Sequence, residues 1–304
     1  MAAVEELTAD CWAHLQLELG EGVRWDARRG ELLWVDVHRG RLYVATLVDV
    51  DLDAVREIDV GGPLTAVFPL PDPDDGWLVG HGEGLAALSR AENLTPLALP
   101  ERGRPGHTRV NDGACDAEGR LWLGSMEYAG APGLGRLYRL DLDGRLTVAH
   151  APTTVSNGIG WSPDGTTMYF VDSGPATITA FAYTGGSLHD PRVLVHLDDG
   201  VPDGLCVDDE GCLWVAVWGA GEVRRFSPDG TLLARVATPA RQPTCCAFGG
   251  PDRDMLLITS ARVGQTETEL SHQPHAGCLF AVQVGVTGPG AHPYRGPLEV
   301  TDAT

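Results

Sequence analysis

The stretch Val201-Pro202-Asp203-Gly204-Leu205-Cys206-Val207-Asp208 places a carboxylate and a glycine directly before a short apolar run that is typical of a β-strand. The turn formers Asp208-Asp209-Glu210-Gly211 follow, and a second apolar run, CLWVAV, occupies residues 212–217. Two short apolar runs separated by turn residues predict a β-hairpin. The rest of the chain repeats this unit.

Six copies of the unit can be aligned by an aromatic or bulky apolar residue in the second run. These equivalent positions are Trp34, Trp77, Trp122, Tyr169, Trp214 and Leu257. Subtracting successive numbers gives spacings of 43, 45, 47, 45 and 43 residues. A period near ~45 residues with several strands per repeat is typical of β-propeller blades. The sequence therefore predicts an all-β, six-bladed β-propeller.

The domain organisation follows from the continuity of these repeats. No linker or change of composition interrupts them, so we expect residues 1–304 to form a single propeller domain. The N-terminal sequence CWAHL at residues 11–15 has the character of a strand. We expect it to close the last blade, because a closed ring leaves fewer exposed sheet edges.

Composition restricts the possible partners. Hydrophobic residues make up 43% of the 304, enough for a core, and 39 glycines with 21 prolines indicate many turns. The formal net charge of −20 argues against nucleic acid or an anionic membrane as a partner, and it is compatible with attraction of cations. No apolar run approaches the ~18 residues that span a bilayer.

The seven cysteines suggest a reducing compartment, because their number is odd and no C-x-x-C pair is present. Cys206 and Cys212 flank the predicted hairpin turn and could pair, but we interpret the cysteines as small buried apolar residues. The first residues lack the basic and apolar regions of a secretory signal. The expected location is the cytoplasm.

Oxygen-bearing side chains recur 11 to 13 residues before each aligned position. They are Glu21, Thr65, Asn111, Asn157, Asp203 and Thr244. The first strand of each blade lines the central channel, so we expect these residues to meet at one end of it. Carboxylate and carboxamide oxygens suit Ca²⁺, Mg²⁺ or Mn²⁺, whereas Zn²⁺ more often recruits His or Cys. Individually, Asn157-Gly158 and Asp203-Gly204 could instead be ordinary turn dipeptides.

Five motifs resemble the SMP-30/gluconolactonase/luciferin-regenerating-enzyme family, which includes regucalcin. They are LGEGVRW (19–25), RVNDG (109–113), GRLWLGSM (119–126), SNGIGWSPDG (156–165) and PDGLCVD (202–208). The resemblance covers roughly residues 15 to 285 and implies a six-bladed propeller with one divalent cation, Ca²⁺, Mg²⁺, Mn²⁺ or Zn²⁺.

The same resemblance implies roles for individual residues. Glu21, Asn157 and Asp203 would bind the metal, and Asp203 would also be the catalytic general base. Arg109 and Asn111 would contact the substrate. Family members carry acidic substrate contacts just after the position of Met126, where this chain has Glu127. The loop at residues 128–135 would be either a lid or plain surface.

The function implied is a metal-dependent hydrolase that opens small sugar lactones such as gluconolactone. The alternatives are a non-catalytic calcium-binding or regulatory propeller, and a related metal-dependent esterase or organophosphate hydrolase. A scaffold of the WD-repeat kind lacks its G-H and W-D signatures. G-x-S-x-G, H-E-x-x-H and Walker A motifs are also absent, which argues against serine hydrolases, zincins and P-loop enzymes.

Overall fold

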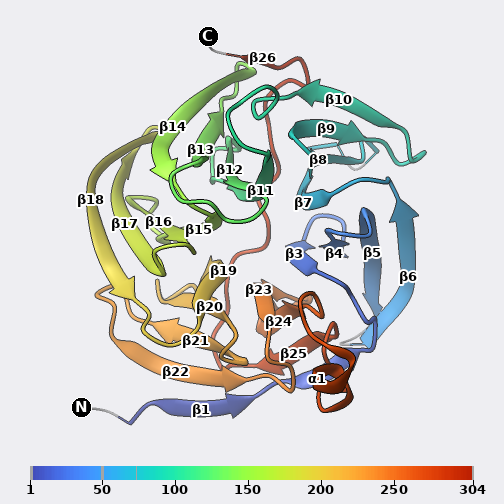
Figure 1. The fold of residues 1–304 in the computed structure, drawn as a ribbon, viewed down its shortest axis with the longest axis vertical. Helices are drawn as coiled ribbons and strands as arrows, with labels where there is room; N and C mark the ends of the chain where they lie inside the picture. Colours follow the sequence, from blue (N-terminus) through green and yellow to red (C-terminus); the bar gives the residue numbers. More distant parts are fainter. Residues whose placement is uncertain (1–2, 49–50, 73, 303–304) are drawn as a thin grey trace.

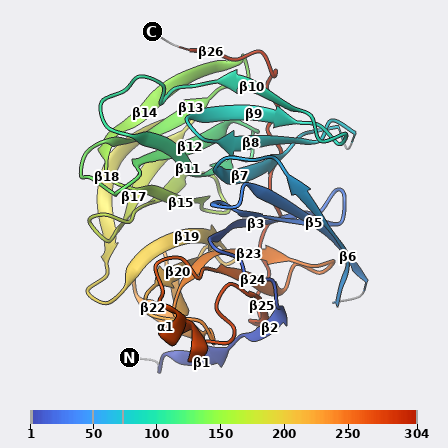
Figure 2. The ribbon, with the colours of Figure 1, turned by 45° about the vertical axis from the view of Figure 1, so that its right-hand side comes forward.

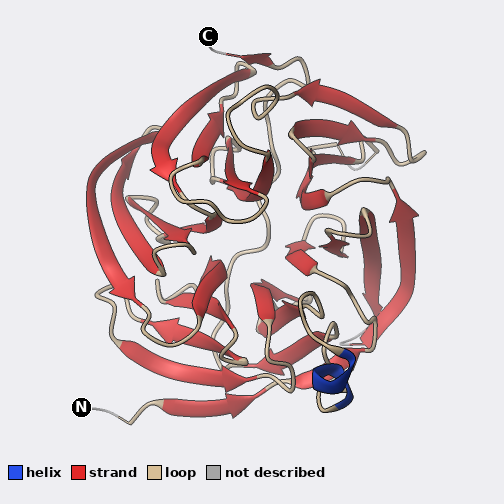
Figure 3. Ribbon diagram, viewed as in Figure 1, coloured by secondary structure: helices blue, strands red, loops and turns tan. Residues whose placement is uncertain are grey.

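The computed structural model describes residues 3–48, 51–72 and 74–302. These residues form six small sheets arranged in a ring, each running from an inner to an outer strand (Figure 1). The predicted six-bladed β-propeller is therefore confirmed. Figure 3 shows strands throughout the ring, with the short helix α1 (Glu267–Ser271) at its rim. No helix within the described ranges is long and apolar enough to cross a bilayer.

The sheets are built as four-stranded meanders, two of which gain a fifth strand. The first three comprise β3 (Gly20–Asp26), β4 (Glu31–Asp36), β5 (Arg41–Val48) and β6 (Asp51–Asp59); β7 (Leu64–Pro69), β8 (Trp77–His81), β9 (Gly84–Leu88) and β10 (Leu94–Ala98); and β11 (Thr108–Cys115), β12 (Leu121–Glu127), β13 (Gly135–Leu140) and β14 (Arg145–Thr153). The fourth and fifth comprise β15 (Ser156–Trp161), β16 (Thr167–Asp172), β17 (Thr177–Thr184) and β18 (Ser187–His196); and β19 (Val201–Val207), β20 (Leu213–Trp218), β21 (Glu222–Phe226) and β22 (Leu232–Ala237). The sixth combines β23 (Pro243–Gly249), β24 (Met255–Ser260) and β25 (Leu279–Gln283) with the N-terminal strand β2 (Asp10–Ala13).

The two ends of the chain add strands at the rim. β1 (Glu5–Thr8) pairs in parallel with β22, and β26 (Thr301–Asp302) pairs in parallel with β14 (Figure 2). Between β25 and β26 the chain crosses the ring rather than following it (Figure 1). Along this crossing Ala291 N–H donates to Trp25 O at 2.8 Å, and Arg295 N–H donates to Gly119 O at 3.0 Å. The repeat pattern of the sequence does not predict this C-terminal strap.

The hydrophobic core lies between neighbouring blades, where the aligned aromatic residues are buried. Trp122 is fully buried and packs edge-on against Trp161 and Tyr183, with ring centroids 6.4 and 5.8 Å away. Its indole N–H donates to Asp116 of the preceding turn at 3.3 Å, and Trp214 donates to Asp208 in the same way at 2.9 Å. In these two repeats a hydrogen bond joins the Asp-rich turn to the aromatic residue, whereas the indole nitrogens of Trp34 and Trp77 are buried without a partner among the described residues.

This packing gives a first testable expectation. Trp122→Ala removes a large buried side chain and one of the hydrogen bonds to the Asp116 carboxylate, so it should lower the free energy of unfolding by about 3–5 kcal/mol. Val148→Ala is a suitable control because Val148 is 48% exposed on β14, and its effect should stay within about 0.5 kcal/mol. Urea unfolding followed by tryptophan fluorescence and circular dichroism measures both. Equal stability of the two variants would contradict the assignment of the core.

Candidate active site

The inner strands of the six blades contact one another around the channel: β3, β7, β11, β15, β19 and β23. Their direction follows from close approaches between β15 and β19. Gly158 lies against Asp203, whereas Gly160, further along its strand, lies against Val207. The inner strands therefore run in the same direction, so their first residues gather at one end of the channel.

A β-bulge interrupts the pairing near the start of every inner strand. Register shifts lie between Glu21 and Arg24, Leu64 and Ala66, Val110 and Gly113, Ser156 and Ile159, Pro202 and Leu205, and Pro243 and Cys245. The residues at or inside these shifts are Glu21, Thr65, Asn111, Asn157, Asp203 and Thr244, the six oxygen-bearing positions found in the sequence. Bulges redirect side chains away from the regular alternation of a strand. Here they recur at the same level of each blade.

Asn157 and Asp203 form a buried, hydrogen-bonded pair at this level. Asn157 is 5% exposed and Asp203 is 7% exposed. The Asn157 Nδ2 group donates to an oxygen of Asp203 and to Ser173 Oγ at 3.1 Å, and Ser173 in turn donates to Pro202 O at 2.7 Å. These bonds fix the amide, and its Oδ1 atom is buried without a hydrogen-bond partner among the described residues. Because buried polar atoms in proteins are rarely left without a partner, this acceptor is a candidate ligand atom.

The glycines beside these residues allow the strands to approach each other. A Cβ atom on Gly204 would lie 2.7 Å from Cys245 Cα and 2.6 Å from its sulfur. Asn157-Gly158 and Asp203-Gly204 lie within β15 and β19, so the interpretation of these dipeptides as turns is wrong. The glycines instead let the inner strands pack closely enough for their side chains to meet.

Negative charge accumulates at this end of the channel. Burial raises the pKa of Glu21 well above its usual range, and the neighbouring carboxylates of Asp203 and Asp112 raise it further. Burial and Asp112 likewise raise the pKa of Asp203, against the lowering effects of the Asn157 hydrogen bond and Arg109. Asp112 is paired with Arg24 at 3.1 Å, so its charge is already partly compensated. Glu21 and Asp203 lack a comparable ion pair among the described residues.

These groups fit a hard divalent cation. Two buried carboxylates that repel each other are stabilised by a cation between them, and a carboxamide oxygen without a partner supplies a further ligand atom. The residues that could hold the ion are Glu21, Asn157 and Asp203, whose chain positions span 182 residues, from 21 to 203.

Arg109 and Asn111 lie beside this group on β11. Arg109 is 7% exposed, and its Nη1 atom donates to Val110 O at 2.9 Å and Asn111 Oδ1 at 2.7 Å. Asn111 Nδ2 donates to Ser156 O at 3.1 Å, which ties the pair to the neighbouring blade. Burial lowers the pKa of Arg109, while Glu21 and Asp203 raise it. The guanidinium group is therefore part of the same electrostatic cluster.

Glu127 has a clear local role. Its carboxylate accepts the N–H groups of Ala129 at 2.8 Å and Ala131 at 3.1 Å. These bonds hold the start of the loop at residues 128–135, whose first residue, Tyr128, lies under the guanidinium of Arg109 at 5.6 Å. His107 also stacks on Tyr128, with ring centroids 4.2 Å apart. Whether Glu127 also contacts substrate stays a prediction.

Several residues of the site were missed in the sequence or lacked a role. Asp112 follows Asn111 directly and raises the pKa of both carboxylates, Glu21 and Asp203. Ser173 lies outside the five motifs and accepts a hydrogen bond from Asn157. Thr244 donates to Gly20 O at 2.5 Å and so supports the strand that carries Glu21. Thr65 Oγ1 is buried without a partner in the described part of the chain. The bulge of β11 could have indicated Asp112, but bulges leave little signal in sequence.

The opposite half of the channel contains a cavity of about 440 Å³. It is lined by later residues of the inner strands, among them Trp25, Cys115, Ile159, Val207 and Phe248, and by residues 289–292 of the C-terminal strap. Arg24 and Asp112 also border it, whereas Glu21, Asn157, Asp203 and Arg109 do not. We therefore assign the candidate site to the end where the carboxylates gather, rather than to this cavity.

Comparison with known proteins provides independent information on this chain. Residues 19–262 match the family described as SMP-30/Gluconolactonase/LRE-like region. L-arabinolactonase of Azospirillum brasilense is 38% identical over 277 residues, covering 89% of this chain and 90% of that protein. 6-Deoxy-6-sulfogluconolactonase of Pseudomonas putida is 32% identical over 285 residues, covering 92% of this chain and 96% of that protein. The crystal structure of a calcium-binding protein, regucalcin, from Agrobacterium tumefaciens superposes with a TM-score of 0.89 at 30% identity, covering 97% of this chain and 100% of that one.

Proposed function

Because the chain belongs to the SMP-30/gluconolactonase/LRE-like family, we propose that it is a divalent-metal-dependent hydrolase that opens small sugar lactones. The observation that carries the proposal is the buried Oδ1 atom of Asn157, which lacks a partner among the described residues. The Nδ2 group of the same amide donates to Asp203, and the Asp203 carboxylate raises the pKa of Glu21. Relatives named as lactonases of arabinose and gluconate derivatives support the class of substrate.

Glu21, Asn157 and Asp203 would hold the cation. When bound, a divalent ion at such a site supplies Lewis-acid polarisation of the lactone carbonyl and acidifies water. The oxygen-only ligand set favours Ca²⁺, Mg²⁺ or Mn²⁺. Calcium is supported by the regucalcin relative, which is described as a calcium-binding protein.

Asp203 is the candidate general base. In the reaction, the oxygen of water bonds to the carbonyl carbon, the ring C–O bond breaks, and the ring oxygen gains a proton to give a hydroxy acid. A carboxylate that accepts the water proton contributes about 10²–10⁴-fold to the rate. The Asn157 amide donates to an oxygen of Asp203 and so holds the orientation of the carboxylate.

Arg109 would stabilise negative charge on the carbonyl oxygen or bind sugar hydroxyls. Among the described residues its hydrogen bonds come from Nη1 alone, which leaves the Nη2 donors for a ligand. Because Arg109 is buried, its charge acts through a medium of low polarity and is worth more than at the surface. Asn111 would position Arg109, and Glu127 would act through the loop that carries Tyr128.

The test is a panel of aldonolactones, incubated with metal-free protein and with Mn²⁺, Zn²⁺, Mg²⁺ or Ca²⁺ in turn. Acid release followed with a pH indicator should require both the protein and a metal, and buffer with metal alone is the control. A phosphotriester and a simple ester in the same panel test the related esterase alternative. If calorimetry detects tight metal binding while no lactone opens faster than in buffer, the protein is a calcium-binding propeller instead.

We also place the protein in the cytoplasm. All seven cysteines lie in described parts of the chain and are free thiols, which supports a reducing compartment.

A further inference from the structure

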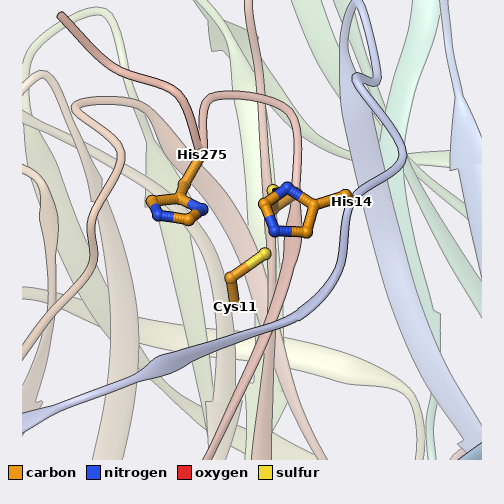
Figure 4. A group of neighbouring side chains, drawn as sticks. Cys11, His14 and His275 are labelled. Atoms are coloured by element: carbon orange, nitrogen blue, oxygen red, sulfur yellow. Dashed lines mark hydrogen bonds between the residues drawn. The ribbon is translucent and has the colours of Figure 1, made fainter.

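A second group of potential ligands lies far from the oxygen site, where the N-terminal strand joins the sixth sheet. Cys11 and His14 come from β2 and the residues after it, and His275 and Cys278 come from the turn before β25. The spacing is Cys-x-x-His in the first segment and His-x-x-Cys in the second. One ligand atom from each of the four side chains lies within 4.8 Å of all the others. In Figure 4 the sulfur of Cys11 points toward the two imidazole rings.

The distances approach those of a tetrahedral zinc site. Zn–S bonds near 2.3 Å and Zn–N bonds near 2.0–2.1 Å imply that neighbouring ligand atoms lie about 3.3–3.8 Å apart. Cys278 Sγ and His14 Nδ1 are already 3.5 Å apart. The rings of His14 and His275 lie 5.0 Å apart at 40°. Small side-chain rotations would bring the remaining ligand atoms to the same separation.

His275 provides a separate indication of a missing ligand. Its Nδ1 atom is buried and has no hydrogen-bond partner within the described residues. A buried imidazole nitrogen in this state is uncommon, because burial without a partner costs free energy. Cys278 is 1% exposed, so one side of the group is shielded from solvent. His14 is exposed, which leaves a route for a metal ion to enter.

The backbone holds the two segments together without help from a ligand. Cys11 lies opposite Phe280 in the antiparallel pairing of β2 and β25. Leu17 N–H donates to Gly277 O at 2.9 Å, and Cys278 N–H donates to His275 O at 3.1 Å. Gly277 has φ of +75°, and a Cβ atom there would lie 2.5 Å from Leu17 O. Only glycine allows this close approach, which places the two ligand pairs side by side.

We propose that Cys11, His14, His275 and Cys278 form a structural Zn²⁺ site that fastens the N-terminal strand to the sixth blade. Two sulfur and two imidazole ligands are the set that zinc prefers, and four protein ligands leave no open position for substrate. The site is distinct from the oxygen cluster in the channel, which favours harder cations. The proposal does not depend on the lactonase assignment.

Cobalt(II) is the probe, because its absorption reports both tetrahedral geometry and thiolate ligation. Titration of the reduced, metal-free protein should produce ligand-field bands of tetrahedral cobalt and a sulfur-to-cobalt charge-transfer band, saturating at one equivalent. Zn²⁺ should then remove both signals. Asp203→Asn should leave them unchanged, because that residue belongs to the other site.

Cys11→Ser and His14→Asn are the test variants, since both side chains are at least partly exposed and their replacement should not prevent folding. Each should lose the charge-transfer band or weaken zinc binding by more than ~100-fold, beyond the effect of losing an outer-sphere partner. Cys206→Ser and His189→Asn are matched controls, a half-buried thiol and an exposed imidazole outside the group, and should behave as the parent protein.

Thermal unfolding and limited proteolysis of the N-terminal segment provide a second measurement. One equivalent of Zn²⁺ should raise the Tm and protect this segment in the parent protein but not in Cys11→Ser. A spectrum without sulfur-to-cobalt charge transfer, or one that persists in both test variants, would overturn the proposal. A Cys11–Cys278 disulfide that persists in a reducing buffer, detected as an intact mass lower by two hydrogens, would overturn it as well.

Discussion

Asp203→Asn is expected to slow the metal-dependent opening of sugar lactones by about 10²–10⁴-fold, the usual value of general-base assistance. The substitution preserves the shape of the side chain while removing its ability to accept a proton and one negative charge from the cation site. Initial rates at saturating metal separate kcat from the weaker metal binding that should accompany the loss. The decrease in kcat should persist when the metal site is saturated.

The same variant should also change stability, in the opposite direction to its effect on activity. Burial and Asp112 raise the pKa of Asp203, so the ionised side chain destabilises the metal-free fold at neutral pH. Asp203→Asn should therefore raise the Tm of the metal-free protein while slowing turnover. A variant that merely misfolds would instead have both a lower Tm and a lower activity.

Asp229→Asn is the matched control for this experiment. Asp229 lies in an exposed turn where its carboxylate accepts Thr231 N–H at 3.2 Å, and its replacement should leave turnover unchanged. If Asp203→Asn kept the activity of this control, the general base would have to be another group in the channel. The raised pKa of Asp203 would then be only a consequence of its burial.

The fold could be predicted because each repeat carries its own structural signal. Turn residues and a buried aromatic or bulky apolar residue recur at a regular spacing, and in the third and fifth repeats a hydrogen bond joins the two, as between Asp116 and Trp122. The candidate site could be located for the same reason: once Trp122 and Trp214 are aligned, rotational symmetry places Asn111 and Asp203 at one level. No knowledge of side-chain contacts was needed for that step.

The remaining features depend on contacts that no local pattern encodes. Each of the six inner strands has a bulge at the level of the candidate site, but a bulge needs only one extra residue and no special composition. Ser173 acquires its role solely because it lies beside Asn157. The C-terminal strap and the strands β1 and β26 depend on short parallel pairings, whose residues have little strand signal of their own.

The cysteine and histidine group illustrates the same limitation. The interpretation of the cysteines as small buried apolar residues fits Cys245 and Cys246, which are both buried. Cys11 and Cys278 are 267 residues apart (278 − 11), and each has a histidine three residues away. The two pairs become one group only when β2 is placed against β25. A metal site of this kind can be predicted from sequence only when the topology is already known.

The metal-free protein is expected to lose stability as the pH rises above about 4, the ordinary carboxyl pKa, and divalent metal should restore it. Folded-state pKa values of Glu21 and Asp203 are raised, so in this range the folded protein holds more protons than the unfolded chain. At a pH near the usual carboxyl pKa, these two groups therefore contribute stability to the folded protein. This contribution falls as the pH rises toward their raised pKa values. A cation replaces the protons, so its stabilising effect should be larger at neutral pH than at pH 5.

Calcium or manganese should be used for this measurement, because zinc would also fill the cysteine–histidine group. At a concentration of about 100 times the dissociation constant, a ligand that binds only the folded state adds ~2.7 kcal/mol, which should appear as a clear rise in Tm in scanning fluorimetry. The double variant Glu21→Gln/Asp203→Asn is the control. It should lose both the calcium response and this part of the pH dependence.

The control also removes a competing effect. Burial lowers the pKa of His150 and His292, and a histidine with a lowered pKa adds stability as pH rises, opposite in sign to the carboxylates. Both histidines are retained in the double variant, so the difference between the two Tm profiles isolates Glu21 and Asp203. Parallel profiles for the two proteins would mean that these carboxylates are not buried together. The cation site and the hydrolase proposed on it would then both have to be abandoned.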